Sequence, residues 1–163
     1  MMVQDMNRNM HLQMKNPYFE TFFKLIDKDQ WPSLLDAQNN QCSQINFLDY
    51  VTILCRFLNT KELVQKFNDM IRTGIMNGNL EIIALIGLNS PQLFPLLQYY
   101  VDRTSDIQTA AYISAYAINI QQISGLVPKR SQNKLSKFIT TYRDFLNNLQ
   151  MWSARAVFDV KLG

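Results

Sequence analysis

Three neighbouring residues, Asp102, Arg103 and Asp106, are the strongest candidates for chemistry in this 163-residue sequence. Two carboxyl groups that lie close together can act as general acid and general base when their surroundings separate their pKa values. A structural role is favoured over catalysis, however. Asp106 precedes a helical pattern, where an aspartate caps the helix and complements its dipole. Asp102 and Arg103 can form an ion pair at the same turn.

The chain contains one histidine, His11, and two cysteines, Cys42 and Cys55. His11 lies in a polar, methionine-rich stretch without a hydrophobic period, so a catalytic base there would lack a rigid frame. The cysteines are too few for a disulfide framework and lack the paired spacing of a zinc knuckle. Cys55 lies in the apolar run 51–58, and we expect it to be buried and inert. We therefore expect no metal, no other cofactor, and an intracellular protein with reduced thiols.

A basic cluster with aromatic neighbours is the second candidate site. Its cationic side chains are those of Lys129, Arg130, Lys134 and Lys137, and the aromatic residues that follow are Phe138 and Tyr142. Cationic and aromatic side chains together can bind the phosphates and bases of RNA. Phe138 and Tyr142 belong to the apolar stripe of a predicted helix, so we expect them to be core residues. We expect no nucleic-acid partner, and keep RNA or acidic-surface binding by the cluster 129–137 as the alternative function.

Composition favours one folded, helical domain. The chain is 47% hydrophobic, has a formal net charge of only +3, and contains five glycines and five prolines. A chain of this length can bury roughly 70% of its unfolded surface. The N-terminus lacks the apolar run of a signal peptide, and no segment approaches the roughly 20 apolar residues of a membrane span. We expect a protein that is neither secreted nor membrane-spanning.

Hydrophobic residues recur at helical intervals along most of the chain. The helices that we expect cover 17–28, 45–58, 60–74, 80–87, 91–101, 106–119 and 135–156. Thr60 and Asn79 are predicted N-caps, while Gly74 and Gly78 mark the end of the third helix. The stretch 97–112 is predicted to form the joint between two helices, in which Tyr100 and Val101 are the hydrophobic anchor. Gln121 to Gln132 is predicted to be a loop because it contains glycine, proline and two adjacent cations.

The last predicted helix carries apolar residues on two sides. Its main stripe runs from Leu135 to Ala156, and Met151, Ala154 and Phe158 lie on the opposite side. A terminal helix should expose one side to water, so we hypothesise that Met151, Ala154 and Phe158 form an open face that binds a partner or self-associates. The alternative is that Phe158 folds back onto the helices of its own chain.

The pattern predicts an all-α fold, an α-solenoid of stacked antiparallel helical hairpins. A compact helical bundle cannot be separated from a solenoid by this pattern alone. We expect a mobile N-terminal lead-in over residues 1–15 and one α-solenoid domain over residues 16–163.

Several short stretches of the sequence resemble the α-solenoid segment of the Mio (missing oocyte) family of WD-repeat proteins. They are, in order, Asn16–Tyr18, Cys55–Leu58, Gly78–Glu81, Gly87–Leu88, Tyr100–Thr104, Asp106–Ala110, Tyr142–Arg143 and Trp152–Asp159. Each stretch is weak by itself, whereas their order and spacing are specific. The resemblance covers residues 16–163, and the loop 121–132 shows no family pattern.

The resemblance implies a non-catalytic scaffold subunit. Mio proteins belong to the SEA or GATOR-type complex, which relays amino-acid sufficiency to the TOR kinase complex at lysosomal or vacuolar membranes. The implied partners are other WD-repeat subunits of that complex, and the implied location is cytoplasmic, peripheral to the membrane surface. Family members carry a propeller before this segment and a zinc module after it. Two cysteines and one histidine cannot build that zinc module, so the sequence looks like a fragment or a solenoid-only relative.

Overall fold

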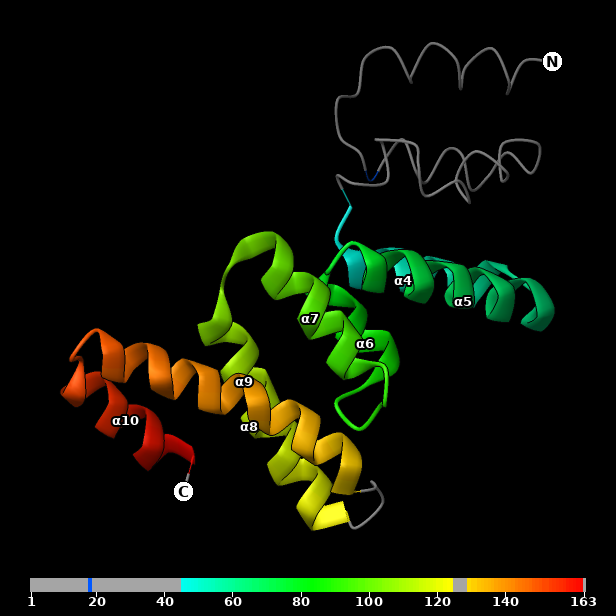
Figure 1. The fold of residues 1–163 in the computed structure, drawn as a ribbon. Coiled ribbons are helices and arrows are strands. Elements are labelled where there is room, and N and C mark those ends of the chain that lie inside the picture. Colours follow the sequence, from blue (N-terminus) through cyan, green and yellow to red (C-terminus); the bar gives the residue numbers. More distant parts are fainter. Residues whose placement is uncertain (1–17, 19–44, 125–128, 163) are drawn as a thin grey trace, which may run out of the picture. The chain divides into compact units, whose positions relative to one another are not determined.

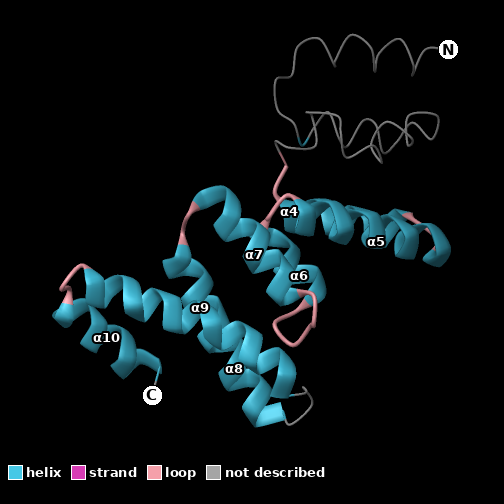
Figure 2. Ribbon diagram, viewed as in Figure 1, coloured by secondary structure: helices cyan, strands magenta, loops and turns pink. Residues whose placement is uncertain are grey.

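The computed structural model describes residues 18, 45–124 and 129–162. Every regular element within these ranges is a helix (Figures 1 and 2), which confirms the predicted all-α fold class. The predicted lead-in 1–15 and nearly all of the predicted helix 17–28 lie outside the described residues. The chain divides into two compact units, Met1–Val64 and Gln65–Gly163.

In the first unit, helix α4 covers Phe47–Phe57 and begins where the side chain of Asn46 accepts a hydrogen bond from the backbone nitrogen of Leu48. Tyr50 and Leu54, one helical turn apart, are buried. Cys55 is exposed, so the prediction that it is buried is wrong. One residue beyond Leu54, the helix has turned by about 100°, which points the thiol away from the buried side.

Helix α5 covers Thr60–Met76 and begins within the first unit. The side-chain oxygen of Asn59 accepts a hydrogen bond of 3.0 Å from the backbone nitrogen of Glu62. Asn59 is therefore the N-cap, and the assignment of that role to Thr60 is wrong by one residue. The sequence signal is ambiguous here because asparagine and threonine both cap helices and stand side by side.

The end of α5 lies in the second unit and is a Schellman turn. The backbone nitrogens of Gly78 and Asn79 donate to the carbonyl oxygens of Ile75 and Gly74, at 3.0 and 2.9 Å. Gly78 has a φ of 63°, as expected for the residue that closes a helix. Gly74 does not end the helix, since it lies inside α5. An added β-carbon at Gly74 would overlap the side chain of Ile82.

The remaining elements are the 3-10 helix η3, Leu80–Ile82, and the helices α6, Ile83–Ile86, α7, Leu93–Thr104, α8, Ile107–Ser124, α9, Lys129–Asn148, and α10, Trp152–Leu162. Asn79 caps η3 as predicted, accepting a hydrogen bond of 3.0 Å from the backbone nitrogen of Glu81. The predicted loop over 121–132 is wrong at both ends, because α8 continues to Ser124 and α9 begins at Lys129.

Within the second unit, α8 and α9 pack along each other, α10 packs on α9, and α7 contacts both α8 and α9 (Figure 1). The side of α8 that faces its neighbours is built from small residues, and Ala110, Ala111, Ser114, Ala115 and Ala117 are all buried. Small side chains permit a close approach of helix backbones, as the sequence indicated. Leu93, Leu97, Leu135 and Phe138 complete the core between α7, α8 and α9.

The joint between α7 and α8 is stabilised by Asp106. One carboxylate oxygen accepts a hydrogen bond of 3.0 Å from the backbone nitrogen of Thr109, and the other accepts one of 2.8 Å from the Tyr100 hydroxyl. Ser105 turns the chain with a φ of 57°. Hydrogen bonds from the side chain and backbone of Thr109 lower the pKa of Asp106. Asp106 is thus confirmed as an N-cap.

We expect Asp106→Ala to lower the free energy of unfolding by about 0.5–2 kcal/mol at pH 7, because the N-cap bond is lost. The folded pKa of Asp106 lies below the unfolded value, so its stabilisation is present above the unfolded pKa and is lost as the pH falls through the folded pKa. Urea unfolding at pH 7 and near pH 3 measures both effects. Asp102→Ala is the matched control, since Asp102 is exposed and accepts one bond, from Gln98. Equal effects of both substitutions would remove the cap assignment.

We expect Ala111→Leu to destabilise the chain by about 1–3 kcal/mol, because Ala111 is fully buried and has no room for three more carbon atoms. Ala156→Leu, on an exposed position of α10, is the control and should change stability by less than about 0.5 kcal/mol. Thermal unfolding of the two variants against the parent chain provides the comparison. A neutral Ala111→Leu would mean that this side of α8 is not closely packed.

Candidate interaction surface

Phe158 is the core anchor of α10. Its side chain is 1% exposed and lies against the rings of Tyr112 and Tyr142, with centroids 5.1 and 4.8 Å away and both pairs edge to face. Burial raises the pKa of the Tyr142 phenol, because it disfavours the charged form. Ala154 packs against the same cluster. Phe158 thus folds back onto the helices of its own chain, and its assignment to an open face is wrong.

Met151 is the one predicted site residue with an exposed side chain, and 46% of its surface is accessible. The structure therefore does not bring Met151, Ala154 and Phe158 together on one outer surface. The error arises because the sequence pattern treats 135–156 as one helix. The chain bends between α9 and α10, where Gln150 has a φ of 56°, so the orientation of α10 does not follow from that of α9.

An ion-pair network joins α9 to α10 beside the aromatic cluster. The carboxylate of Asp159 accepts hydrogen bonds from the Nε atoms of Arg143 and Arg155, at 2.9 and 2.8 Å. A second nitrogen of Arg155 donates to the side-chain oxygen of Asn147 at 3.0 Å. Two nitrogens of Arg143 lie against one oxygen of Asp159 and Arg155 pairs with the other, so both carboxylate oxygens have a charged partner. The spacing of Arg155 and Asp159 suits a helical pair, but nothing in the sequence identifies Arg143 as the third member.

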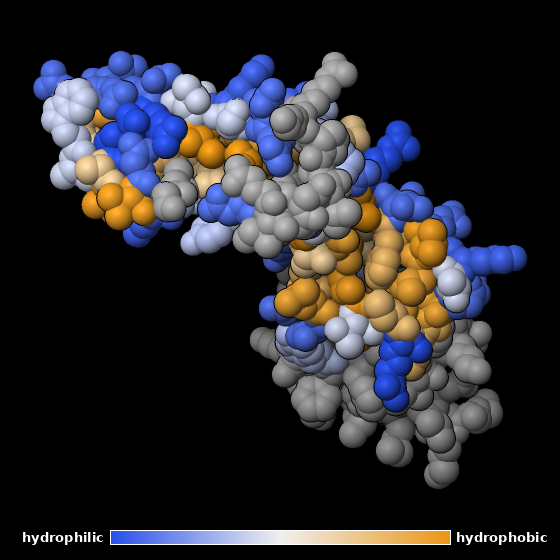
Figure 3. Space-filling view, turned by 90° about the horizontal axis from the view of Figure 1, so that it is seen from below, coloured by the Kyte–Doolittle hydropathy of each residue, from blue (hydrophilic) through white to orange (hydrophobic). Residues whose placement is uncertain are grey.

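The outer surfaces of α9 and α10 carry large apolar side chains. Those more than one-third exposed are Phe145, Leu149, Met151, Trp152, Val157 and Val160. In the space-filling view, hydrophobic areas appear among hydrophilic ones at the left end, where α9 and α10 lie (Figure 3). Exposed apolar side chains such as these are candidates for contact with another protein.

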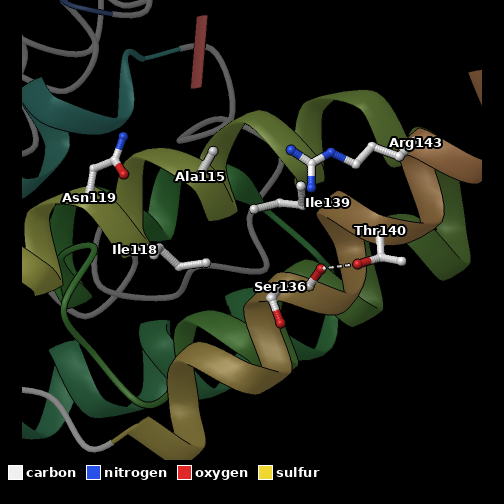
Figure 4. A pocket seen from close by; sticks show the side chains of 7 residues that line it. All are labelled: Ala115, Ile118, Asn119, Ser136, Ile139, Thr140 and Arg143. Atoms are coloured by element: carbon white, nitrogen blue, oxygen red, sulfur yellow. Dashed lines mark hydrogen bonds between the residues drawn. The ribbon is translucent and has the colours of Figure 1, made fainter. Parts of the chain in front are cut away.

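A shallow groove of about 220 Å³ lies between α8 and α9. Ala115, Ile118 and Asn119 line one side, and Ser136, Ile139, Thr140 and Arg143 line the other (Figure 4). The Thr140 hydroxyl donates to the backbone carbonyl of Ser136, and the Arg143 guanidinium is paired with Asp159. Its lining combines the apolar side chains of Ala115, Ile118 and Ile139 with four polar ones.

The acid–base hypothesis gains no geometric support. Both carboxylate oxygens of Asp106 accept hydrogen bonds within the joint, and Asp102 accepts from Gln98 on the exposed side of α7. The expected ion pair between Asp102 and Arg103 is not formed. In the described ranges, no three histidine, cysteine, aspartate or glutamate side chains are placed to hold a metal ion.

The basic cluster offers no aromatic surface for base stacking. Phe138 and Tyr142 are core residues, 6% and 7% exposed, which confirms the sequence interpretation. The ammonium group of Lys134 lies 5.4 Å from the ring centroid of Phe94, close enough for a cation–π contact. None of the described helices is both long and apolar enough to cross a membrane.

The fold and these surfaces define the class: an all-α protein whose described residues offer surfaces for protein contact. The chain is 33% identical to SEH-associated protein 4 of Saccharomyces cerevisiae over 94% of its length, and 32% identical to an uncharacterized WD repeat-containing protein of Schizosaccharomyces pombe over 96%. It is 31% identical to the GATOR2 complex protein MIOS-A of Xenopus laevis, also over 96%. No protein-family model matches the chain.

The chain belongs to the Mio family. It spans only 13–17% of the length of these three relatives. Four stretches that carry the resemblance have structural roles in this chain. Tyr100 and Asp106 form the α7–α8 joint, and Arg143, Arg155 and Asp159 join α9 to α10.

Proposed function

We propose that this chain acts as part of a SEA- or GATOR2-type complex, in protein-complex assembly for amino-acid signalling to the TOR kinase complex. The observation that carries the proposal is similarity over at least 90% of the chain to several proteins named as GATOR2 complex subunits, and to SEH-associated protein 4. Its role is that of a non-catalytic scaffold. Its location is the cytoplasmic surface of the lysosome or vacuole, reached through the complex.

The proposed architecture is an α-solenoid domain over residues 16–163. Consecutive helices with short connections support it, since α8 packs on α9 and α9 packs on α10. Such an arrangement presents helix surfaces to partners without requiring a central ligand site.

Met151 is the proposed contact for another subunit. It is exposed at the bend between α9 and α10, next to the exposed side chains of Leu149 and Trp152. Phe158 and Ala154 do not belong to this surface. They pack against the core and thereby hold α10 in place. A WD-repeat subunit is the partner class that the resemblance to the Mio family implies.

Co-purification tests the proposal. Tagged chain is expressed in cells, and the recovered proteins are identified by mass spectrometry. WD-repeat subunits of a SEA- or GATOR2-type complex should be enriched, whereas recovery of chaperones alone would contradict complex membership. Met151→Glu should reduce that enrichment, and Asn148→Glu, at an exposed polar position nearby, is the control. Equal recovery with both variants would overturn the Met151 contact and leave complex membership intact.

A further inference from the structure

The bend between α9 and α10 is a Schellman turn with an unusual residue at its key position. The backbone nitrogens of Gln150 and Met151 donate to the carbonyl oxygens of Asn147 and Leu146, at 3.0 and 2.9 Å. The same pattern closes α5, where the residue with positive φ is Gly78. At the α9–α10 bend that residue is Gln150, and a side chain makes the left-handed conformation costly.

The start of α10 is also weakly specified by its local sequence. The backbone nitrogen of Arg155 donates to the carbonyl oxygen of Met151, which places Met151 at the N-cap. Methionine offers no side-chain oxygen to the free backbone nitrogens of a first helical turn. The residues from Leu149 to Ala156 include no glycine or proline, and most are good helix formers. Local preference therefore favours one uninterrupted helix where the structure has a bend.

Tertiary contacts must hold the bend closed. Phe158 fills the pocket between Tyr112 and Tyr142, and Asp159 pairs with Arg143. Arg143 and Asp159 are 16 residues apart, which in a straight helix would separate them by about 24 Å. Straightening would thus break the contact between Arg143 and Asp159 within one chain and empty the pocket of Phe158.

A straight α9–α10 helix would gather exposed apolar residues into one stripe. Phe145, Leu149, Trp152 and Ala156 would fall within roughly 60° of one another at about 100° per residue. In the bent form these four side chains are exposed, and Phe145, Leu149 and Trp152 are 49%, 54% and 63% accessible. The sequence therefore carries a continuous hydrophobic stripe that the bent form leaves in water.

We infer that α10 exchanges between two copies of this chain, with α9 and α10 joined as one straight helix in each copy. Phe158 of the partner subunit then fills the Tyr112–Tyr142 pocket, and Asp159 of the partner subunit pairs with Arg143. The two straight helices cross near Gln150 and bury the stripe formed by Phe145, Leu149, Trp152 and Ala156. The contacts of Phe158 and Asp159 are kept, the stripe is covered, and the left-handed conformation at Gln150 is no longer needed.

A second copy is the occupant that these observations select, because it alone presents an identical α10. The exchange is a property of this chain by itself and does not depend on membership of a larger complex. Domain exchange is favoured when the connecting turn is short and strained, as it is here.

The first test uses the whole 163-residue chain and changes only the turn. Gln150 is exposed, so substitutions there leave the core intact. Glycine at position 150 stabilises the bent form by roughly 1 kcal/mol, which corresponds to a factor of about 5 for each turn. Each exchanged dimer opens two such turns, so the factor applies twice. Gln150→Gly should therefore raise the dimer dissociation constant by about 30-fold, while Gln150→Ala should leave it unchanged or lower it. Equilibrium sedimentation after a heat–cool cycle measures both constants.

The second test identifies the exchanged contact. Arg143→Glu and Asp159→Arg each place like charges across the α9–α10 contact of a closed monomer. In an exchanged heterodimer of the two variants, both contacts join opposite charges again. Mixing the variants should thus produce a heterodimer that neither variant forms with itself, detected by native mass spectrometry with one variant isotopically labelled.

Two results would overturn the exchange. One is that Gln150→Gly and Gln150→Ala do not differ in their association, either because both are monomers or because both have the same dimer dissociation constant. The latter would indicate a dimer formed by surfaces outside the bend. The other is a mixture of the charge variants that contains no heterodimer although both variants fold, as judged by circular dichroism.

Discussion

Phe158→Ala should lower the free energy of unfolding by about 3–5 kcal/mol, the range found when a buried phenylalanine is truncated in a closely packed core. Phe158 is 1% exposed and contacts two tyrosine rings edge to face, so the substitution removes both apolar burial and ring contacts. The remaining cavity would be lined by Tyr112, Tyr142 and Ala111 of the same cluster. Urea unfolding followed by circular dichroism provides the measurement.

Val157→Ala is the matched control for Phe158→Ala. Val157 is the neighbouring residue on the same helix and is 53% exposed. Its truncation should cost less than about 1 kcal/mol, since little apolar surface returns to water. If both substitutions had similar small effects, Phe158 would not be a core residue and the open face proposed from the sequence would regain support.

Helix positions could be predicted from the sequence where a polar cap stands before an apolar repeat. Asn79 before η3 and Asp106 before α8 are of this kind, and the structure confirms both caps. The hydrophobic period and the N-cap hydrogen bond both involve residues within one or two helical turns. A single sequence is therefore sufficient to predict where such a helix begins. The small-residue side of α8 is a further case, because Ala110 and Ala111 follow the helical period and are fully buried.

The bend between α9 and α10 could not be predicted from the sequence. Leu149, Gln150 and Met151 contain no helix breaker, and the apolar period continues across them. What closes the bend is the contact of Phe158 with Tyr112, a residue on another helix and 46 positions earlier in the chain. A contact between segments so far apart leaves no trace in a local pattern, and the predicted site was misplaced for that reason.

Burial of single side chains was a second point at which local pattern failed. Cys55 lies in an apolar run, yet it is exposed because α4 buries only the side that carries Tyr50 and Leu54. The ion pair between Arg143 and Asp159 was also missed, since its members lie on two helices that the pattern treated as one. Similarity to Mio proteins, by contrast, came from the order of short stretches and did not require the helix boundaries to be right.

Gly78→Ala should destabilise the chain by about 2–5 kcal/mol, which is the sum of two costs. An alanine in the left-handed conformation costs roughly 1–2 kcal/mol, and Gly78 has a φ of 63°. Overpacking adds about 1–3 kcal/mol, because the new β-carbon would lie 2.7 Å from the backbone nitrogen of Tyr100 and 2.8 Å from its α-carbon. Backbone atoms inside α7 cannot rotate away, so the strain must be taken up by moving α7 or opening the turn after α5.

Asn77→Ala separates this effect from general sensitivity of the turn. Asn77 precedes Gly78 and is exposed, so its truncation should change stability by less than about 0.5 kcal/mol. Thermal unfolding of both variants gives the comparison, and equal stability would mean that the turn and α7 do not touch.

The contact between Gly78 and Tyr100 joins two of the stretches that resemble Mio proteins. Gly78–Glu81 and Tyr100–Thr104 are separate in the sequence, and the contact between Gly78 and Tyr100 places them together in the fold. A side chain at Gly78 should therefore disturb the α7–α8 joint that Tyr100 and Asp106 form.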